Sequence, residues 1–127
     1  MNTVEQNLRI LKNSLNKLKR ESFDTILIHN AEDLIGKNGK KLFHLLIELK
    51  KIGICKKIGV SLYKKKTLRK IFKKFKIDVI QLPYNIIQNE FSDLELLNLK
   101  KKYKFLEIHA RSIFHQGLLL KKKSGII

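Results

Sequence analysis

Three polar residues stand where short apolar stretches of the chain stop, and their types could serve ligand chemistry. The stretches are Asp24–His29, Lys57–Ser61 and Asp78–Gln81. His29, Ser61 and Gln81 carry an imidazole, a hydroxyl and an amide, which are all hydrogen-bonding groups. In α/β sheets the ligand chemistry lies at the carboxyl ends of the strands. The pattern therefore predicts that these three side chains share one polar rim.

The apolar runs themselves predict buried strands. Residues 25–28, Thr-Ile-Leu-Ile, show no polar alternation, which is typical of a strand covered on both faces. A fourth strand is expected at Phe105–His109. Gly59, inside a strand, predicts close packing of neighbouring backbone, and Cys55 is interpreted as a small hydrophobic residue at a strand edge.

Helices are predicted between these strands from apolar residues spaced three and four apart. The expected helices are Thr3–Lys19, Lys40–Lys51, Lys64–Phe75 and Phe91–Lys102, with Leu11, Leu46, Phe72 and Leu97 among their inner residues. Thr3 and Gln6 have the spacing of a capping box, and Gly53 suits a left-handed C-cap. Residues 30–39 and 82–89 are expected to be loops.

The alternation of strands and helices predicts a parallel sheet with right-handed crossovers. The two edge strands, near Ile26 and Ile108, would leave backbone groups unpaired. Such edges favour self-association or binding of a partner.

Size and composition are those of one globular domain. The chain has 127 residues, 43% of them hydrophobic, and a single cysteine, so no internal disulfide can form. No apolar run reaches the length of a membrane span, and no signal-peptide core is recognised, so a cytoplasmic protein is expected. His109 and His115 are interpreted as packing or solvent-facing residues, and no metal site is expected.

The formal net charge of +17 could indicate nucleic acid or another anionic partner. Lysine greatly outnumbers arginine, and Ile and Asn are abundant, which favours compositional drift in an A+T-rich genome. Aromatic residues do not interleave with Lys64–Lys66 or Lys100–Lys102 along the sequence, so a nucleic-acid surface is disfavoured. A non-catalytic basic module that binds nucleic acid or other anions remains the alternative function.

Four sequence blocks together resemble the aldo-keto reductases. They are Ile-Leu-Ile-His ending at His29, Ile-Gly-Val-Ser ending at Ser61, Gln-Leu-Pro-Tyr-Asn from Gln81 to Asn85, and Arg-Ser-Ile-Phe-His-Gln-Gly-Leu-Leu from Arg111 to Leu119. Their order and spacing match the family, as does the leading amphipathic helix. The resemblance implies part of a (β/α)₈ TIM barrel, from its third helix to just past its seventh strand, within residues 1–120. Residues 121–127 would be a basic and apolar tail.

The resemblance also implies roles for individual residues. His29 is similar to the catalytic histidine that orients the substrate carbonyl. Ser61 and Gln81 are similar to residues that hydrogen-bond the nicotinamide of NADPH, and Arg111 falls where many members have a tyrosine stacking on that ring. Leu62 replaces an asparagine of many members, so one amide contact is in doubt.

The family's catalytic tyrosine, lysine and aspartate have no counterpart in this chain, by the same resemblance. We therefore expect an NADP-dependent oxidoreductase domain, truncated relative to the family and inactive alone, with weak or no NADPH binding. The implied partners are a complementary N-terminal barrel half or a second copy. A small carbonyl substrate is implied once the barrel is assembled.

Overall fold

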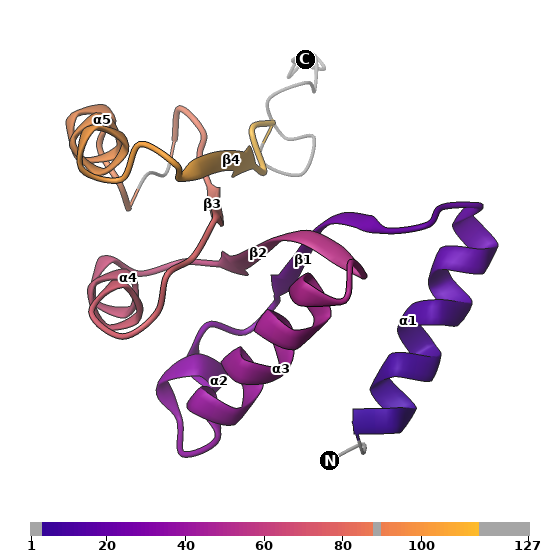
Figure 1. The fold of residues 1–127 in the computed structure, drawn as a ribbon. Helices are drawn as coiled ribbons and strands as arrows, with labels where there is room; N and C mark the ends of the chain where they lie inside the picture. Colours follow the sequence, from indigo (N-terminus) through magenta and orange to yellow (C-terminus); the bar gives the residue numbers. More distant parts are fainter. Residues whose placement is uncertain (1–3, 88–89, 115–127) are drawn as a thin grey trace, which may run out of the picture.

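A computed structural model describes residues 4–87 and 90–114 of the chain. Its elements are α1 (Val4–Leu18), β1 (Phe23–Ile28), α2 (Glu32–Ile35), α3 (Gly39–Lys51), β2 (Cys55–Ser61), α4 (Lys65–Phe72), β3 (Val79–Pro83), α5 (Asp93–Lys102) and β4 (Glu107–Arg111). The four strands form one parallel sheet in the order β1-β2-β3-β4 (Figure 1). The predicted α/β architecture with a parallel sheet is confirmed, and β1 and β4 are its edges.

The sheet has its main core on the side of the helices. Helices α3, α4 and α5 lie along the outer side of the curved sheet (Figure 1). Alternate strand residues enter this core and are less than 2% exposed: Ile58, Val60, Leu62, Ile80 and Leu82. Because strand side chains alternate between faces, Ser61 and Gln81 belong to the opposite, concave side.

Gly59 allows two neighbouring strands to approach β2 closely. A Cβ atom at this position would lie 2.4 Å from Leu27 Cδ2 and 3.0 Å from the carbonyl oxygen of Val79. The predicted close packing is therefore confirmed. Gly53, with φ of +80°, likewise has the predicted left-handed conformation after α3.

The strand β1 differs from its sequence prediction. Thr25, Ile26 and Leu27 are half-buried, and only Ile28 in this strand is buried. The prediction of a strand covered on both faces was wrong for this chain. Its uniformly apolar sequence does not reveal that β1 pairs with β2 alone, at the edge of the sheet.

The short helix α2 was predicted as loop. Leu34 is 2% exposed, and Ala31 is also buried, so their three-residue spacing marks a buried helical turn. The Thr67 hydroxyl donates to Glu32 Oε1 at 2.9 Å and joins α4 to α2. Because α2 has only four residues, its apolar spacing was too short to distinguish it from a loop.

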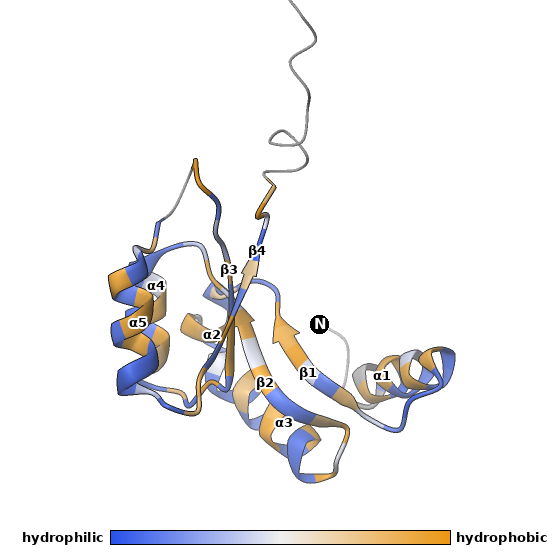
Figure 2. Cartoon of the chain, turned by 90° about the horizontal axis from the view of Figure 1, so that it is seen from above, coloured by the Kyte–Doolittle hydropathy of each residue, from blue (hydrophilic) through white to orange (hydrophobic). Residues whose placement is uncertain are grey.

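The helices confirm most of the predicted inner residues. Leu46 is 5% exposed, and Leu11 and Phe72 are partly buried against the core. Leu97, in contrast, is 57% exposed, so its predicted inward position was wrong. Leu96 and Leu99 pack on the core instead. Hydrophobic and hydrophilic residues both appear on the visible side of α5 (Figure 2), which explains why spacing alone misassigned its inner face.

Several boundaries also differ from the sequence prediction. Helix α4 ends at Phe72, three residues early, and strand β3 continues to Pro83, which had been placed in a loop. Strand β4 is shifted two residues toward the C-terminus. Thr3 of the predicted capping box and the tail 121–127 lie outside the described residues.

Candidate active-site rim

Ser61 and Gln81 lie side by side in the sheet register. Ser61 of β2 pairs with Gln81 of β3, and Gln81 pairs with His109 of β4. His29 follows Ile28, whose register partner Val60 directly precedes Ser61. The structure thus brings His29, Ser61 and Gln81 to one level of the sheet, where β1 and β2 end and β3 continues for two more residues.

The three residues differ in their exposure to solvent. Ser61 is 4% exposed, Gln81 is half-buried, and His29 is exposed at the end of β1. The backbone N–H of Leu62 donates to the Gln81 carbonyl at 2.7 Å, so strand pairing continues beyond Ser61. The Leu62 side chain is fully buried in the helix-side core. It therefore cannot take the place of a ligand-binding amide at the rim.

Arg111 lies two residues further along β4 than His109, the register partner of Gln81. It pairs with Pro83, so it is the last residue of β4 and lies beyond the strand Phe105–His109 that the sequence predicted. Its guanidinium carbon lies 4.4 Å from the centroid of the Tyr63 ring. The Nε and Nη2 atoms of Arg111 are buried and have no hydrogen-bond acceptor among the described residues. These two nitrogen atoms carry three N–H bonds, none of which has an acceptor among the described residues.

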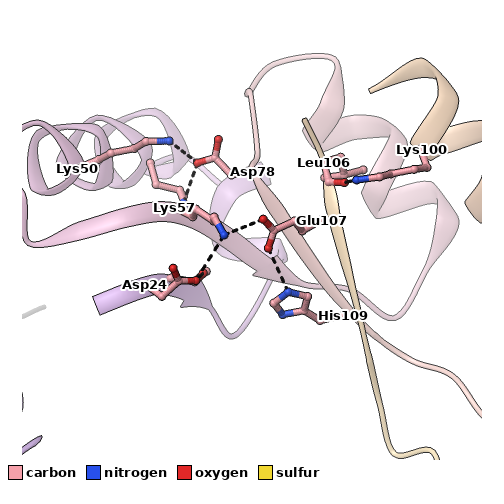
Figure 3. A network of polar contacts seen from close by, with 10 residues as sticks. Asp24, Lys50, Lys57, Asp78, Lys100, Leu106, Glu107 and His109 are labelled. Carbon is pink, nitrogen blue, oxygen red and sulfur yellow. Dashed lines mark hydrogen bonds and ion pairs between the residues drawn. The ribbon is translucent and has the colours of Figure 1, made fainter. Parts of the chain in front are cut away.

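An ion network that sequence analysis missed lies below the rim (Figure 3). Lys57 Nζ is 2.7 Å from Glu107 Oε1 and 3.6 Å from Asp24 Oδ2. His109 Nε2 lies 3.4 Å from Glu107 Oε2. Lys57 and Glu107 come from strands that are separated by β3, so only the three-dimensional register could reveal the contact.

The charges in this network stabilise one another. The hydrogen bond from Lys57 lowers the pKa of Glu107, and the same contact raises the pKa of Lys57. A hydrogen bond from Thr25, followed by the charge of Lys57, lowers the pKa of Asp24. These groups therefore remain charged near neutral pH and give the concave side of the sheet a polar lining.

The model of the aldo/keto reductase family matches residues 2–126 of the chain. The chain belongs to this family. No curated protein matches it.

Solved structures of aldo/keto reductases share the fold of this chain. The apo form of an aldo-keto reductase from Bacillus halodurans has a TM-score of 0.70 at 22% identity, covering 87% of this chain and 38% of that one. A glycerol dehydrogenase from Gluconobacter oxydans has a TM-score of 0.70 at 19% identity, covering 98% and 37%. An aldo/keto reductase from Brucella melitensis has a TM-score of 0.60 at 24% identity, covering 86% and 41%.

This aldo/keto reductase chain spans about two fifths of the length of those structures. Its four parallel strands and flanking helices correspond to part of a (β/α)₈ TIM barrel. The concave side, with Ser61, Gln81 and the ion network, is the side that faces inward in such a barrel. None of the described helices is long and apolar enough to cross a membrane.

Two further features of this aldo/keto reductase chain concern reactive groups. Cys55 is buried at the start of β2, and burial raises the pKa of its thiol, so little reactive thiolate forms near neutral pH. Among the described residues, no three His, Cys, Asp or Glu side chains are grouped to hold a metal ion. His115, whose role had been predicted, lies outside the described part.

Proposed function

We propose that this chain supplies the nicotinamide-facing and carbonyl-facing wall of an NADPH-dependent carbonyl reductase and does not turn over substrate alone. The observation that carries the proposal is the register of Ser61 with Gln81, with His29 at the same level on the neighbouring strand. Three different hydrogen-bonding side chains at one level of three neighbouring strands, toward their carboxyl ends, fit an active-site rim of this barrel type.

Each rim residue has a proposed role. The exposed imidazole of His29 orients the substrate carbonyl by hydrogen bonding. The hydroxyl of Ser61 and the amide of Gln81 offer both donors and acceptors, which is the complement that a nicotinamide carboxamide requires. Arg111 contributes the N–H groups that lack an acceptor among the described residues, so it fits a cofactor oxygen. NADPH, when bound, supplies the hydride.

The proposed inactivity rests on the proton that must reach the developing alkoxide. General acid catalysis contributes roughly 10²- to 10⁴-fold to such a rate. Each of the three tyrosines contacts another residue, Tyr84 through its hydroxyl and the other two through their rings. Tyr63 lies under Arg111, the Tyr84 hydroxyl donates to Asp93, and Tyr103 packs against Phe72 at 4.9 Å between ring centroids. By the resemblance to the family, none of these tyrosines lies where the family's catalytic tyrosine does.

The partner in this proposal is a polypeptide that carries the remaining barrel strands. An open hollow of about 650 Å³ lies between α5 and β4 and is lined in part by Leu96, Leu97 and Ile108. β4 is an edge strand with exposed apolar neighbours. A further strand and helix would therefore cover both the unpaired edge of β4 and this hollow. A second copy of this chain is the competing occupant.

The test measures NADPH oxidation with a panel of aldehydes. We expect no turnover by the 127-residue chain alone. Turnover should appear when a polypeptide that carries the remaining barrel strands is added, and His29→Ala should abolish it. His44→Ala is the matched control, since His44 is exposed in the middle of α3. Turnover by the isolated chain that disappears in His29→Ala would refute the proposal and reveal another proton donor.

A further inference from the structure

We infer that a groove at the amino ends of β3 and β4 binds single-stranded nucleic acid. The groove has a volume of about 320 Å³, and we call it the aromatic groove; it is lined by Phe72, Lys74, Phe75, Lys76, Ile77, Tyr103 and Phe105. Its volume lies at the lower end of the roughly 300–1,000 Å³ of small-ligand sites. The inference is independent of the proposed reductase function.

The aromatic rings form a connected group with one accessible member. Tyr103 lies 4.9 Å from Phe72 and 6.1 Å from Phe105, measured between ring centroids. Phe105 is 46% exposed, whereas the rings behind it are partly buried against the core. Phe105 therefore offers a ring to solvent that its neighbours hold in place. Rings in this setting are platforms on which nucleobases stack.

Lysine ammonium groups lie over the faces of two of these rings. Lys76 Nζ is 4.8 Å from the centroid of Phe105, and Lys102 Nζ is 5.3 Å from the centroid of Tyr103. The sequence showed no interleaving of aromatics with the lysine clusters, because Lys76 and Phe105 are far apart along the chain. Folding nevertheless places them together, so the groove combines stacking surface with positive charge.

The positive charge extends from the groove along α4. Residues 64–76 contain eight lysines and arginines and no acidic residue. Lys73, Lys74 and Lys76 form no ion pair with a carboxylate in the described part of the chain. A second hollow of about 590 Å³ on α4 is lined by Lys65, Lys66, Arg69, Lys70, Lys73 and Glu90. Unpaired cations beside a stacking ring match the phosphates and bases of a single strand.

The groove lies at the opposite end of the sheet from the active-site rim. Ile77 and Phe105 precede β3 and β4, whereas Ser61 ends β2 and Gln81 lies within β3. Helices α4 and α5 are neighbours at the left of Figure 1 and line a common hollow. A nucleic-acid strand bound in the aromatic groove would leave His29, Ser61 and Gln81 open to other ligands. Nucleic-acid binding and NADPH binding can therefore be measured separately.

The first experiment uses fluorescence anisotropy with single-stranded oligothymidylate and oligouridylate. The labelled strands are about 12 nucleotides long, within the ~4–16 nucleotides that single-strand-binding folds cover. With three or four phosphate contacts, affinity should fall roughly 20- to 50-fold between about 50 and 200 mM salt. An abasic strand of equal length should bind at least about tenfold more weakly, because it keeps the phosphates and lacks stacking bases. Comparison of the affinities for the two labelled strands shows whether the groove prefers DNA or RNA.

Variants locate the site. Phe105→Ala and Phe105→Leu should each weaken binding roughly tenfold, and Phe105→Leu keeps an apolar side chain that protects the fold. Phe114→Ala should bind as the parent does, since Phe114 is 55% exposed beyond the other end of β4. The triple change Lys73→Ser, Lys74→Ser, Lys76→Ser should reduce the salt dependence, whereas Lys40→Ser with Lys41→Ser on α3 should not.

Three results would overturn the inference. They are absence of binding at low salt, equal binding of the abasic strand, and equal weakening by the α3 lysine changes. The last two outcomes would mean that net charge alone attracts polyanions and that the aromatic groove is not a site.

Discussion

Asp78 contacts three elements of the fold, α3, β2 and β4. Its Oδ2 atom lies 2.6 Å from Lys50 Nζ of α3 and accepts a hydrogen bond from the Ile58 N–H of β2 at 2.9 Å (Figure 3). The backbone N–H of Asp78 donates a hydrogen bond to the Ile58 carbonyl of β2, and the Asp78 carbonyl accepts one from the Glu107 N–H of β4. The carboxylate is 19% exposed, so solvent cannot easily replace these partners.

Asp78→Ala should therefore destabilise the chain by about 1–3 kcal/mol, because it leaves the Ile58 N–H without its acceptor. Urea unfolding followed by circular dichroism measures the change in the free energy of unfolding. Glu48→Ala is the control, since Glu48 pairs with Lys51 at the surface with a side chain 59% exposed. Such exposed pairs contribute about 0–1 kcal/mol. Equal effects of the two changes would contradict the bridging role of Asp78.

Gly59 gives a second prediction at the residue scale. Gly59→Ala should destabilise the chain by about 1–3 kcal/mol, because the new methyl group would meet Leu27 and the backbone of Val79. Gly36→Ala should change stability by less than about 1 kcal/mol, since a Cβ there has its nearest atom at 3.5 Å and φ is −67°. Thermal unfolding compares both variants with the parent. A tolerated alanine at position 59 would show that β1 and β3 can move apart.

The sequence revealed some of these residues and not others, for a physical reason. Ser61 and His29 were recognisable because each directly follows or ends an apolar run, which is a local pattern. The contact of Lys57 with Glu107 depends on the register of three strands, and the position of Arg111 over Tyr63 depends on how far β4 extends. Such long-range features leave little local signal.

At the scale of elements, α5 begins with a complete capping box. The Ser92 hydroxyl accepts from the Glu95 N–H, and Glu95 Oε2 accepts from the Ser92 N–H at 2.9 Å. Lys65 of α4 also lies 2.8 Å from Glu95 Oε2. The Lys65 contact, followed by the Ser92 bonds, lowers the pKa of Glu95 from 4.5 to about 2.

This lowered pKa predicts an acid-dependent stability. A carboxylate with a lower pKa in the folded state stabilises the fold above its ordinary pKa, and that contribution is lost as pH falls. For Glu95 the loss should occur between about pH 4.5 and pH 2. Urea midpoints measured across this window should fall less in Glu95→Gln than in the parent. Lys65→Gln should flatten the curve in the same direction, and parallel curves for all three proteins would contradict the prediction.

The edge strands predict association. Because β1 and β4 each pair on one side only, and Leu94 and Leu97 are exposed on α5, copies of the chain should self-associate at high concentration. Size-exclusion chromatography with light scattering measures the mass across a concentration series. Leu97→Lys places a charge beside β4 and should shift the series toward monomer, whereas Ile52→Lys after α3 should not. A strictly monomeric parent at high concentration would refute the prediction.

Element types were more predictable than element faces. Every predicted strand is present, and each long helix was found from its apolar spacing. Helix α5 shows the limit, because Leu94, Leu96, Leu97 and Leu99 surround its axis and the spacing does not select one face. Only packing against the sheet decides that Leu96 and Leu99 lie inward.

At the scale of the whole molecule, the concave side of the sheet is polar. The side chains of Lys57, Glu107 and His109 are 32%, 38% and 44% exposed. The interior of a complete barrel is filled by layers of side chains from all its strands. A partial barrel exposes this side to water, and a lining of paired charges tolerates water better than an apolar lining would.

Each strand of the sheet pairs with the next strand in the chain. This order has a consequence for folding during translation. A nascent chain leaves the ribosome N-terminus first, at about 5–20 residues per second. Strand β2 ends at Ser61 and β3 begins at Val79, so about 1–4 s of synthesis separate them at that rate. Each emerging strand finds its neighbour already made and need not wait for later segments. These four strands can thus join the sheet one at a time during synthesis, with β4 joining after the other three.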